Sequence, residues 1–207
     1  MRSLTENRFV KNAYWTLLNA RTRFRIRRLL HGGNSIRLDI GSGSKRGCNG
    51  WTTVDRGRVC DVSWDLRRGI PFPGDSVQQI YMSHFLEHLS FREMQRFLLE
   101  CLRVLKSGAV ISVAVPDAHL YVSAYLNAAS VGPPPTTYEA AWHGTTAIDF
   151  LNYIGYMDGH HKHMFDADHL VHVLAAAGFR DVRLRPFDAS LDLEERRLES
   201  VYAEALK

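Results

Sequence analysis

The sequence predicts an α/β domain built on a mostly parallel β-sheet, and three observations support this prediction. Short apolar segments typical of strands alternate with helical segments after residue 35. A glycine-rich loop, Gly41-Ser42-Gly43, directly follows the first of these strands. Residues 109–115 form a continuous apolar run, which is typical of a strand buried on both faces. A chain of 207 residues with 45% hydrophobic and 23% charged residues suits one globular domain.

A basic arm precedes this domain, and we place the boundary between 1–34 and 35–207, at a Gly-Gly-Asn breaker. Residues 1–30 hold eight Lys or Arg and one Glu, whereas the remainder holds 18 basic and 21 acidic residues. Apolar residues recur among the basic ones, so we expect one or two amphipathic helices. The arm could lie on an anionic membrane, hold phosphates of a substrate, or pack on the domain with its basic face in solvent.

The composition also bears on the compartment. No apolar run approaches the roughly 20 residues that span a bilayer, and the arm lacks the pattern of a secretory signal. The three cysteines, Cys48, Cys60 and Cys101, have no CxxC spacing and are interpreted as reduced thiols. We therefore expect a cytoplasmic protein, with the arm as its one means of reaching the inner membrane surface.

Each element of the domain has its own local signal. Strands are predicted at 36–40, 51–54, 77–82, 109–115 and 182–184, with a third short element leading to Trp64-Asp65-Leu66. Apolar spacing predicts a helix over 91–104, and Asp166 is a good N-cap for a second helix that ends before Gly178. The tail 200–206 is helical by propensity but could be a strand by its position.

Residues 118–160 interrupt this rhythm with a triple proline (133–135) and many aromatic residues. We interpret this insert as a cover over the acceptor-binding pocket, because aromatic rings stack on sugars and other rings. Ordinary core combined with a homodimer contact is the alternative interpretation.

Acidic residues follow the glycine loop at the ends of successive strands. The loop alone is a weak signal, because Gly41 and Gly43 lack the third glycine of a dinucleotide site. Asp55 ends the second strand, where a carboxylate can accept both hydroxyls of a ribose. Asp65 ends the third element, where it can accept from an adenine amino group.

In this order, the segments resemble class I S-adenosylmethionine-dependent methyltransferases, most closely the small bacterial branch associated with surface-polysaccharide biosynthesis. The matching segments are 38–43, 50–55, 64–66, 70–73, 80–89, 102–108, 163–165, 174–179 and the tail 200–207. The resemblance implies a Rossmann-like, seven-stranded, mostly parallel sheet with helices on both faces. It makes the tail 200–206 the last, antiparallel strand.

The resemblance also implies S-adenosylmethionine as the cofactor and assigns residues to it. The implied cofactor-binding residues are Asp39, Gly41, Ser42, Gly43, Asp55, Asp65, Leu66, Ser83 and His84. The sequence departs from the wider class in two ways. Ser44-Lys45-Arg46 stands where many relatives have another glycine, and the linker from Gly43 to Trp51 is too short for a full helix.

Histidines are the candidate bases for methyl transfer to a hydroxyl, because their pKa is nearest to neutral. We expect His84 to be the base, since it follows the fourth strand, and His163 is the second candidate. His84 could instead only pack over the cofactor. His88, Tyr121, His160 and His161 are predicted to contact the acceptor. The cluster 160–163 could bind a metal ion or form a solvated loop, but we expect no metal.

Three classes of function remain open from the sequence. The first is a methyltransferase acting on a hydroxyl, less readily an amine, of a small molecule or saccharide precursor. The second is an RNA methyltransferase steered by the arm, although we do not expect nucleic acid as a partner because no Asn-Pro-Pro-Tyr-type segment follows the fourth strand. The third is a non-catalytic binding module with a cofactor fold.

Overall fold

The computed structural model of the chain describes residues 8–33, 35–57, 59–127, 134 and 146–207. Most of the triple proline, together with Tyr138 and Trp142 of the predicted acceptor cover, lies outside the described residues.

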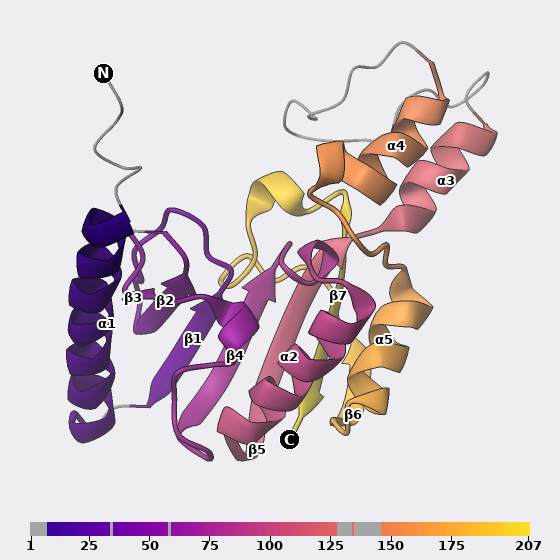
Figure 1. The fold of residues 1–207 in the computed structure, drawn as a ribbon. Coiled ribbons are helices and arrows are strands. Elements are labelled where there is room, and N and C mark those ends of the chain that lie inside the picture. Colours follow the sequence, from indigo (N-terminus) through magenta and orange to yellow (C-terminus); the bar gives the residue numbers. More distant parts are fainter. Residues whose placement is uncertain (1–7, 34, 58, 128–133, 135–145) are drawn as a thin grey trace.

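A single seven-stranded sheet forms the centre of the molecule (Figure 1). Its strands are β1 (Ile36–Ile40), β2 (Trp51–Asp55), β3 (Val62–Ser63), β4 (Val77–Ser83), β5 (Leu105–Pro116), β6 (Arg180–Leu184) and β7 (Ser200–Leu206). The strand order is β3-β2-β1-β4-β5-β7-β6. β1 to β5 pair in parallel, and β7 runs antiparallel to both β5 and β6. The predicted Rossmann-like architecture is confirmed, and the tail is a strand despite its helical propensity.

Two strands begin earlier than the sequence predicts. β5 begins at Leu105, directly at the end of the preceding helix, rather than at Ala109. Leu105 is fully buried and pairs with Val77, so extended backbone is favoured before the apolar run starts. β6 begins at Arg180, two residues early, because Arg180 pairs with Leu206 at the end of β7.

The helices are α1 (Arg8–His31), α2 (Phe91–Val104), α3 (Ala118–Leu126), α4 (Ile148–Tyr156) and α5 (Ala167–Ala176). A capping box between Ser90 and Glu93 starts α2 where the sequence predicts it, and the side chain of Asp166 caps α5 by accepting from His169 N. As expected from its length, the segment between β1 and β2 contains no helix.

The insert builds a helical hairpin over one end of the sheet. Figure 1 shows α3 and α4 above the end at which β4 and β5 point upward. The two helices share a small core of their own, made by Ala118, Tyr121, Ala124, Phe150, Tyr153 and Ile154. The aromatic residues of the described insert therefore serve partly as core, as the alternative interpretation proposed.

The arm forms one long helix that packs beside the β3 edge of the sheet. Thr22 Oγ1 donates to Ser63 O at 3.1 Å, and Arg25 forms an ion pair with Asp61 at 3.0 Å. Ile26 is buried in the main core. Within the described residues, no helix combines the length and the apolar character required to traverse a bilayer.

Candidate functional site

The parallel strands bring their carboxyl ends to one edge of the sheet, below the α3–α4 hairpin. Ile40, Asp55 and Ser83 end the neighbouring strands β1, β2 and β4. Ligands of open α/β sheets bind at this edge. Most sequence-predicted cofactor residues lie in these strand ends or in the loops that follow them, whereas Asp65 and Leu66 follow β3.

The glycine loop turns sharply at the end of β1. Gly41 has φ +69°, and a Cβ atom there would lie 2.4 Å from Cδ2 of the Phe85 ring. Gly43 has φ +65°, but a Cβ atom there would meet nothing within 4 Å. Gly41 thus makes room for Phe85, whereas Gly43 leaves open space above the loop.

Asp55 ties the loop to the end of β2. Its Oδ2 accepts from Gly43 N at 2.9 Å, and its Oδ1 accepts from Arg56 N. A carboxylate offers about four lone-pair directions, so acceptor capacity remains for two ribose hydroxyls. This geometry fits the role that the resemblance implies for Asp55.

Asp39 and Ser42 line the start of the same loop. Burial raises the pKa of Asp39, and Lys45 partly opposes this shift. The buried Ser42 hydroxyl has no hydrogen-bond partner among the described residues. A carboxylate that is desolvated and a hydroxyl without a partner both gain from a polar ligand, such as the amino-acid group of S-adenosylmethionine.

Asp65 is engaged locally rather than free. It caps a short 3-10 helix, Leu66–Arg68, and both of its oxygens accept from Arg67, at 2.9 and 2.7 Å. These hydrogen bonds lower the pKa of Asp65. Leu66 is buried beside it. An adenine amino group would therefore share Asp65 with an exposed arginine.

Ser83 and His84 follow at the end of β4. The hydroxyl and the carbonyl of Ser83 accept from Arg196 Nη1, at 3.2 and 3.1 Å. His84 has φ +52°, a conformation that costs energy for a residue with a side chain and is frequent at functional sites. Its backbone N–H donates to Ala114 O at 2.9 Å, which holds it in place.

The His84 imidazole is directed to the boundary between the strand edge and a cavity. Its Nε2 lies 2.7 Å from Ser200 Oγ, and its Nδ1 lies 3.9 Å from Glu87 Oε1 and 3.7 Å from Glu199 Oε1. Burial lowers the pKa of His84 well below its ordinary value, with the charge of Arg196 acting in the same direction. Burial therefore favours the neutral form of the ring.

A cavity of about 320 Å³ lies next to this edge and gathers most of the titratable side chains of the region. It is lined by His84, Glu87, His88, Pro116, Tyr153, Met157, His161, Glu195, Arg196 and Glu199. The insert contributes Tyr153 of α4 and Met157, which follows it. A pocket of this kind, with convergent polar groups beside a predicted cofactor edge, is the natural place for an acceptor.

Of the predicted acceptor contacts, the structure brings His88 and His161 to the cavity. Backbone bonds hold them together, because Lys162 N and His163 N both donate to Glu87 O, at 2.8 and 3.2 Å. His160 is exposed, and its carbonyl lies 3.0 Å from His88 Nδ1. Tyr121 is fully buried and donates to Glu199 Oε2 at 2.9 Å, so it positions a cavity residue and does not line the cavity.

His163 lies outside this group, although it is only two residues from His161. Its ring packs against Phe91 and Phe165, and its Nε2 lies 2.6 Å from His169 Nε2. As a second candidate base, His163 is predicted to lie beside the acceptor. In the structure, it does not line the cavity. The segment 160–164 is irregular, so the two-residue spacing sends the side chains to different neighbours.

Sequence reasoning missed four charged residues of the cavity wall: Glu87 as a lining group, Glu195, Arg196 and Glu199. The last three lie in the segment before β7. Because β7 is antiparallel to β5, it begins at the edge where the parallel strands end. The charged residues at 194–197 and 199, before a last antiparallel strand, were the signal that could have found these three.

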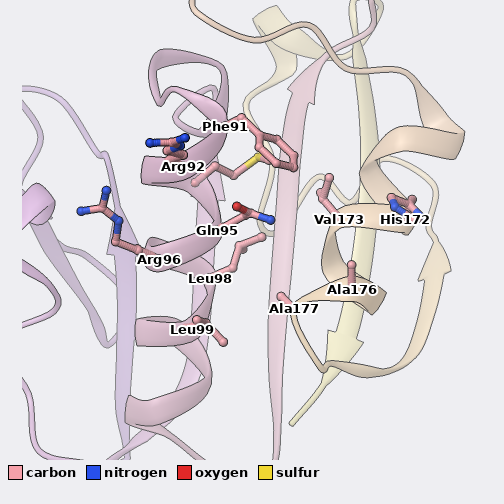
Figure 2. A pocket seen from close by; sticks show the side chains of 11 residues that line it. Phe91, Arg92, Gln95, Arg96, Leu98, Leu99, His172, Val173, Ala176 and Ala177 are labelled. Atoms are coloured by element: carbon pink, nitrogen blue, oxygen red, sulfur yellow. The ribbon is translucent and has the colours of Figure 1, made fainter.

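A second hollow lies between α2 and α5 and has a different character. Figure 2 shows Phe91, Leu98 and Leu99 of α2 across from Val173 and Ala177 on the α5 side. Its volume is about 470 Å³, and its lining contains no carboxylate and one histidine, His172. This groove lacks the cluster of histidines and carboxylates that lines the first cavity.

Comparison with known proteins gives a family match over part of the chain. Residues 48–113 match the model of a family described as a methyltransferase domain. This match includes Asp55, Asp65, Ser83 and His84. No curated protein matches the sequence.

Solved structures show the same fold at low identity. A SAM-dependent methyltransferase from Archaeoglobus fulgidus is 20% identical, covers 93% of this chain and 94% of its own, and has a TM-score of 0.50. An S-adenosylmethionine-dependent methyltransferase from Mesorhizobium loti is 15% identical with a TM-score of 0.51, over 94% of this chain and 98% of its own. A phosphoethanolamine N-methyltransferase from Haemonchus contortus, solved with S-adenosylmethionine, is 13% identical with a TM-score of 0.51, over 93% of this chain and 52% of its own.

Proposed function

We propose that the protein is an S-adenosylmethionine-dependent methyltransferase that methylates a hydroxyl group of a small molecule or saccharide precursor. The family match over residues 48–113 and the shared fold support this proposal. The observation that carries this proposal is the cavity lined by His84, Glu87 and Glu199 at the end of β4, beside the cofactor edge. Such a pocket suits a polar acceptor better than an apolar one.

S-adenosylmethionine, when bound, supplies an electrophilic methyl group on a positively charged sulfur. Asp55 would hold the ribose hydroxyls, and Asp39 with Ser42 would hold the amino-acid group. These contacts fix the direction of the methyl group, and orientation is a large part of catalysis in such displacements.

His84 is the proposed base, on the basis of its position. Its Nδ1 faces the carboxylates of the cavity wall, and Ser200 holds the other ring nitrogen. The acceptor oxygen forms a bond to the methyl carbon as the carbon–sulfur bond breaks. The hydroxyl proton passes to His84 and then to solvent, so the products are a methyl ether and S-adenosylhomocysteine.

Calorimetry with S-adenosylmethionine, combined with an assay for S-adenosylhomocysteine, tests the proposal. The wild-type protein should bind the cofactor and turn over with saccharide or small-molecule alcohols. His84→Ala should lower kcat by about a hundredfold. Absence of binding at millimolar cofactor would favour the non-catalytic module, and a salt-dependent gel shift with tRNA would favour an RNA substrate.

The arm supports a proposed location for this reaction at an anionic membrane surface. The buried side of α1 faces β3 through Thr22 and Ile26, while Arg21, Arg23, Arg27 and Arg28 are exposed. Such exposed positive charges are attracted to anionic lipids. Co-sedimentation with vesicles that contain phosphatidylglycerol, but not with pure phosphatidylcholine vesicles, is the expected result; equal behaviour on both would contradict it.

A further inference from the structure

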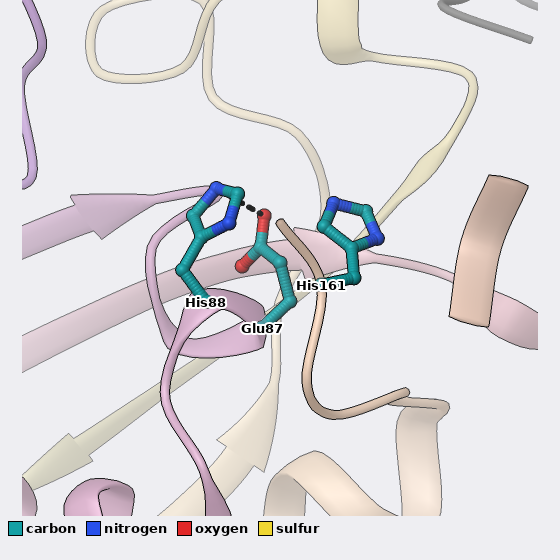
Figure 3. Close-up of side chains that lie close together, drawn as sticks. All are labelled: Glu87, His88 and His161. Carbon is teal, nitrogen blue, oxygen red and sulfur yellow. Dashed lines mark ion pairs between the residues drawn. The ribbon is translucent and has the colours of Figure 1, made fainter. Parts of the chain in front are cut away.

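Glu87, His88 and His161 converge on one point of the cavity wall. Figure 3 shows the carboxylate of Glu87 between the two imidazole rings. One donor atom of each residue lies within 4.8 Å of the donor atoms of the other two. Glu87 is 1% exposed, and neither of its carboxylate oxygens has a hydrogen-bond partner among the described residues. A buried carboxylate without donors is costly, so its position needs an explanation.

The two histidines are oriented as metal ligands usually are. His88 Nδ1 lies 3.0 Å from the carbonyl of His160, and His161 Nδ1 lies 2.9 Å from the carbonyl of Ile154. Because a carbonyl can only accept, each Nδ1 carries the proton. In the neutral rings, the lone pair is therefore on Nε2. Ligating histidines are typically fixed in this way by a backbone carbonyl at the opposite ring nitrogen.

The Nε2 atoms lie near the carboxylate of Glu87, and no hydrogen-bond donor from the described part of the chain lies between them. His88 Nε2 lies 3.9 Å from Glu87 Oε1, which is too long for a hydrogen bond. In Figure 3, the ring of His161 lies on the other side of the same carboxylate. Three electron-pair donors gathered around one point favour a proton or a cation between them.

The backbone also brings the three residues together before any ligand arrives. Glu87 and His88 belong to a 3-10 turn, Leu86–His88, and the carbonyl of Glu87 accepts from the N–H groups that follow His161. His161 N in turn donates to Tyr156 O at 3.0 Å at the end of α4. The cluster thus joins the end of β4 to the insert.

We propose that Glu87, His88 and His161 bind a divalent transition-metal ion, such as Zn²⁺, Mn²⁺ or Co²⁺. Two imidazoles and one carboxylate suit these ions better than Mg²⁺ or Ca²⁺, which prefer oxygen ligands alone. The sequence predicts no metal when only the spacing within 160–163 is taken into account. The site combines His161 of that segment with two residues that lie 73 positions or more before it.

Glu87, His88 and His161 all line the cavity of about 320 Å³, so an ion that they hold would be open to the cavity. There it would bind the oxygen of the acceptor and favour loss of the hydroxyl proton to His84; this part rests on the proposed function. The methyl group would still pass from sulfur to oxygen as described above, with no further reactant.

Metal binding is tested on the full-length protein after removal of metal by a chelator. Titration with Co²⁺, followed by visible absorption, should show one equivalent bound, and Zn²⁺ should displace it. Glu87→Gln and His161→Ala should each weaken Co²⁺ binding by about a hundredfold, because each removes a metal ligand. Loss of a residue that only hydrogen-bonds to a ligand should have a smaller effect. His172→Ala removes an exposed histidine outside the cluster and should bind like the wild type.

His88→Gln is the second variant should the buried substitutions prevent folding, because His88 is 37% exposed at its side chain. The proposal is overturned if the wild type binds neither ion at 1 mM, an upper bound for weak sites. It is equally overturned if folded cluster variants bind Co²⁺ as the wild type does.

Calorimetry with S-adenosylmethionine on the same samples separates this proposal from the proposed function. A protein that binds Co²⁺ through Glu87 but does not bind S-adenosylmethionine would retain the metal site and lose the methyltransferase role. A protein that binds the cofactor but no metal would do the opposite.

Discussion

The guanidinium of Arg185 binds both carboxylate oxygens of Asp192, at 2.6 and 2.8 Å, in a buried ion pair. Asp192 also accepts from Tyr81 Oη at 3.2 Å and from Asp188 N at 2.8 Å. This network fixes the chain between β6 and β7 against the sheet. The same connection carries Arg196 and Glu199 to the cavity, so the network supports the site as well as the fold.

Asp192→Ala should lower the free energy of unfolding by about 3–5 kcal/mol, because it leaves the Arg185 charge buried and unpaired. Urea unfolding at pH 7 measures the change. Arg183→Gln is the matched control, since Arg183 of β6 forms an exposed ion pair with Glu204 of the neighbouring strand β7. It should cost less than about 1 kcal/mol. Equal losses in the two variants would contradict the role given to burial.

Gly41 and Gly43 are required for different reasons: a positive φ at both, and a close neighbour at Gly41 alone. Both have positive φ, but only Gly41 faces a neighbour, the ring of Phe85. Gly43→Ala should lower stability by about 1 kcal/mol, the cost of a left-handed backbone with a side chain. Gly41→Ala adds a steric clash of about 1–3 kcal/mol more. Thermal unfolding monitored by circular dichroism would detect the difference, and the same shift for both variants would argue against the Phe85 contact.

The sequence predicted the elements whose signals are local. The bounds of β1 and α2 agree with the structure because a breaker or a capping box marks where they begin. The last strand is predicted only from its position in the family that the sequence resembles, since its own propensity is helical. What the sequence could not provide were contacts between distant segments, which no local pattern encodes.

The cavity illustrates this limit. His161 and His163 are equivalent by spacing, yet one faces Glu87 and the other packs on Phe91. The difference arises because the backbone N–H groups of Lys162 and His163 bond to one carbonyl, that of Glu87, which rotates the loop. Glu199 is likewise placed by the antiparallel pairing of β7, a tertiary property.

Asp55→Asn should weaken binding of S-adenosylmethionine by about 10- to 100-fold, because a neutral amide accepts less strongly from the ribose hydroxyls than a carboxylate. Calorimetry measures the dissociation constant. Asp181→Asn is the control, since Asp181 is exposed on β6, the edge strand that lies farthest from β2. If both variants bind as the wild type does, the ribose is held elsewhere.

Asp61 links three parts of the molecule near the cofactor edge. Its Oδ2 accepts from Gly47 N at 2.8 Å and from the backbone and hydroxyl of Thr53 at 3.2 and 3.1 Å, while Arg25 of α1 contacts Oδ1. Burial alone would raise the pKa of Asp61, but the hydrogen bonds from Thr53 and Gly47 outweigh it and lower the pKa below the ordinary value of 3.8. The ionised form is therefore favoured by folding.

A carboxyl group with a lowered pKa in the folded state stabilises the protein above its ordinary pKa, and this contribution disappears as pH falls through the lower, folded value. Asp61→Asn should therefore reduce the free energy of unfolding by about 1–2 kcal/mol at pH 7. The difference from the wild type should shrink as pH falls below 3.8. Urea unfolding at a series of pH values measures this, with Asp181→Asn as the control. A difference that stays constant from pH 7 down to pH 3 would show that Asp61 acts through shape and not through its charge.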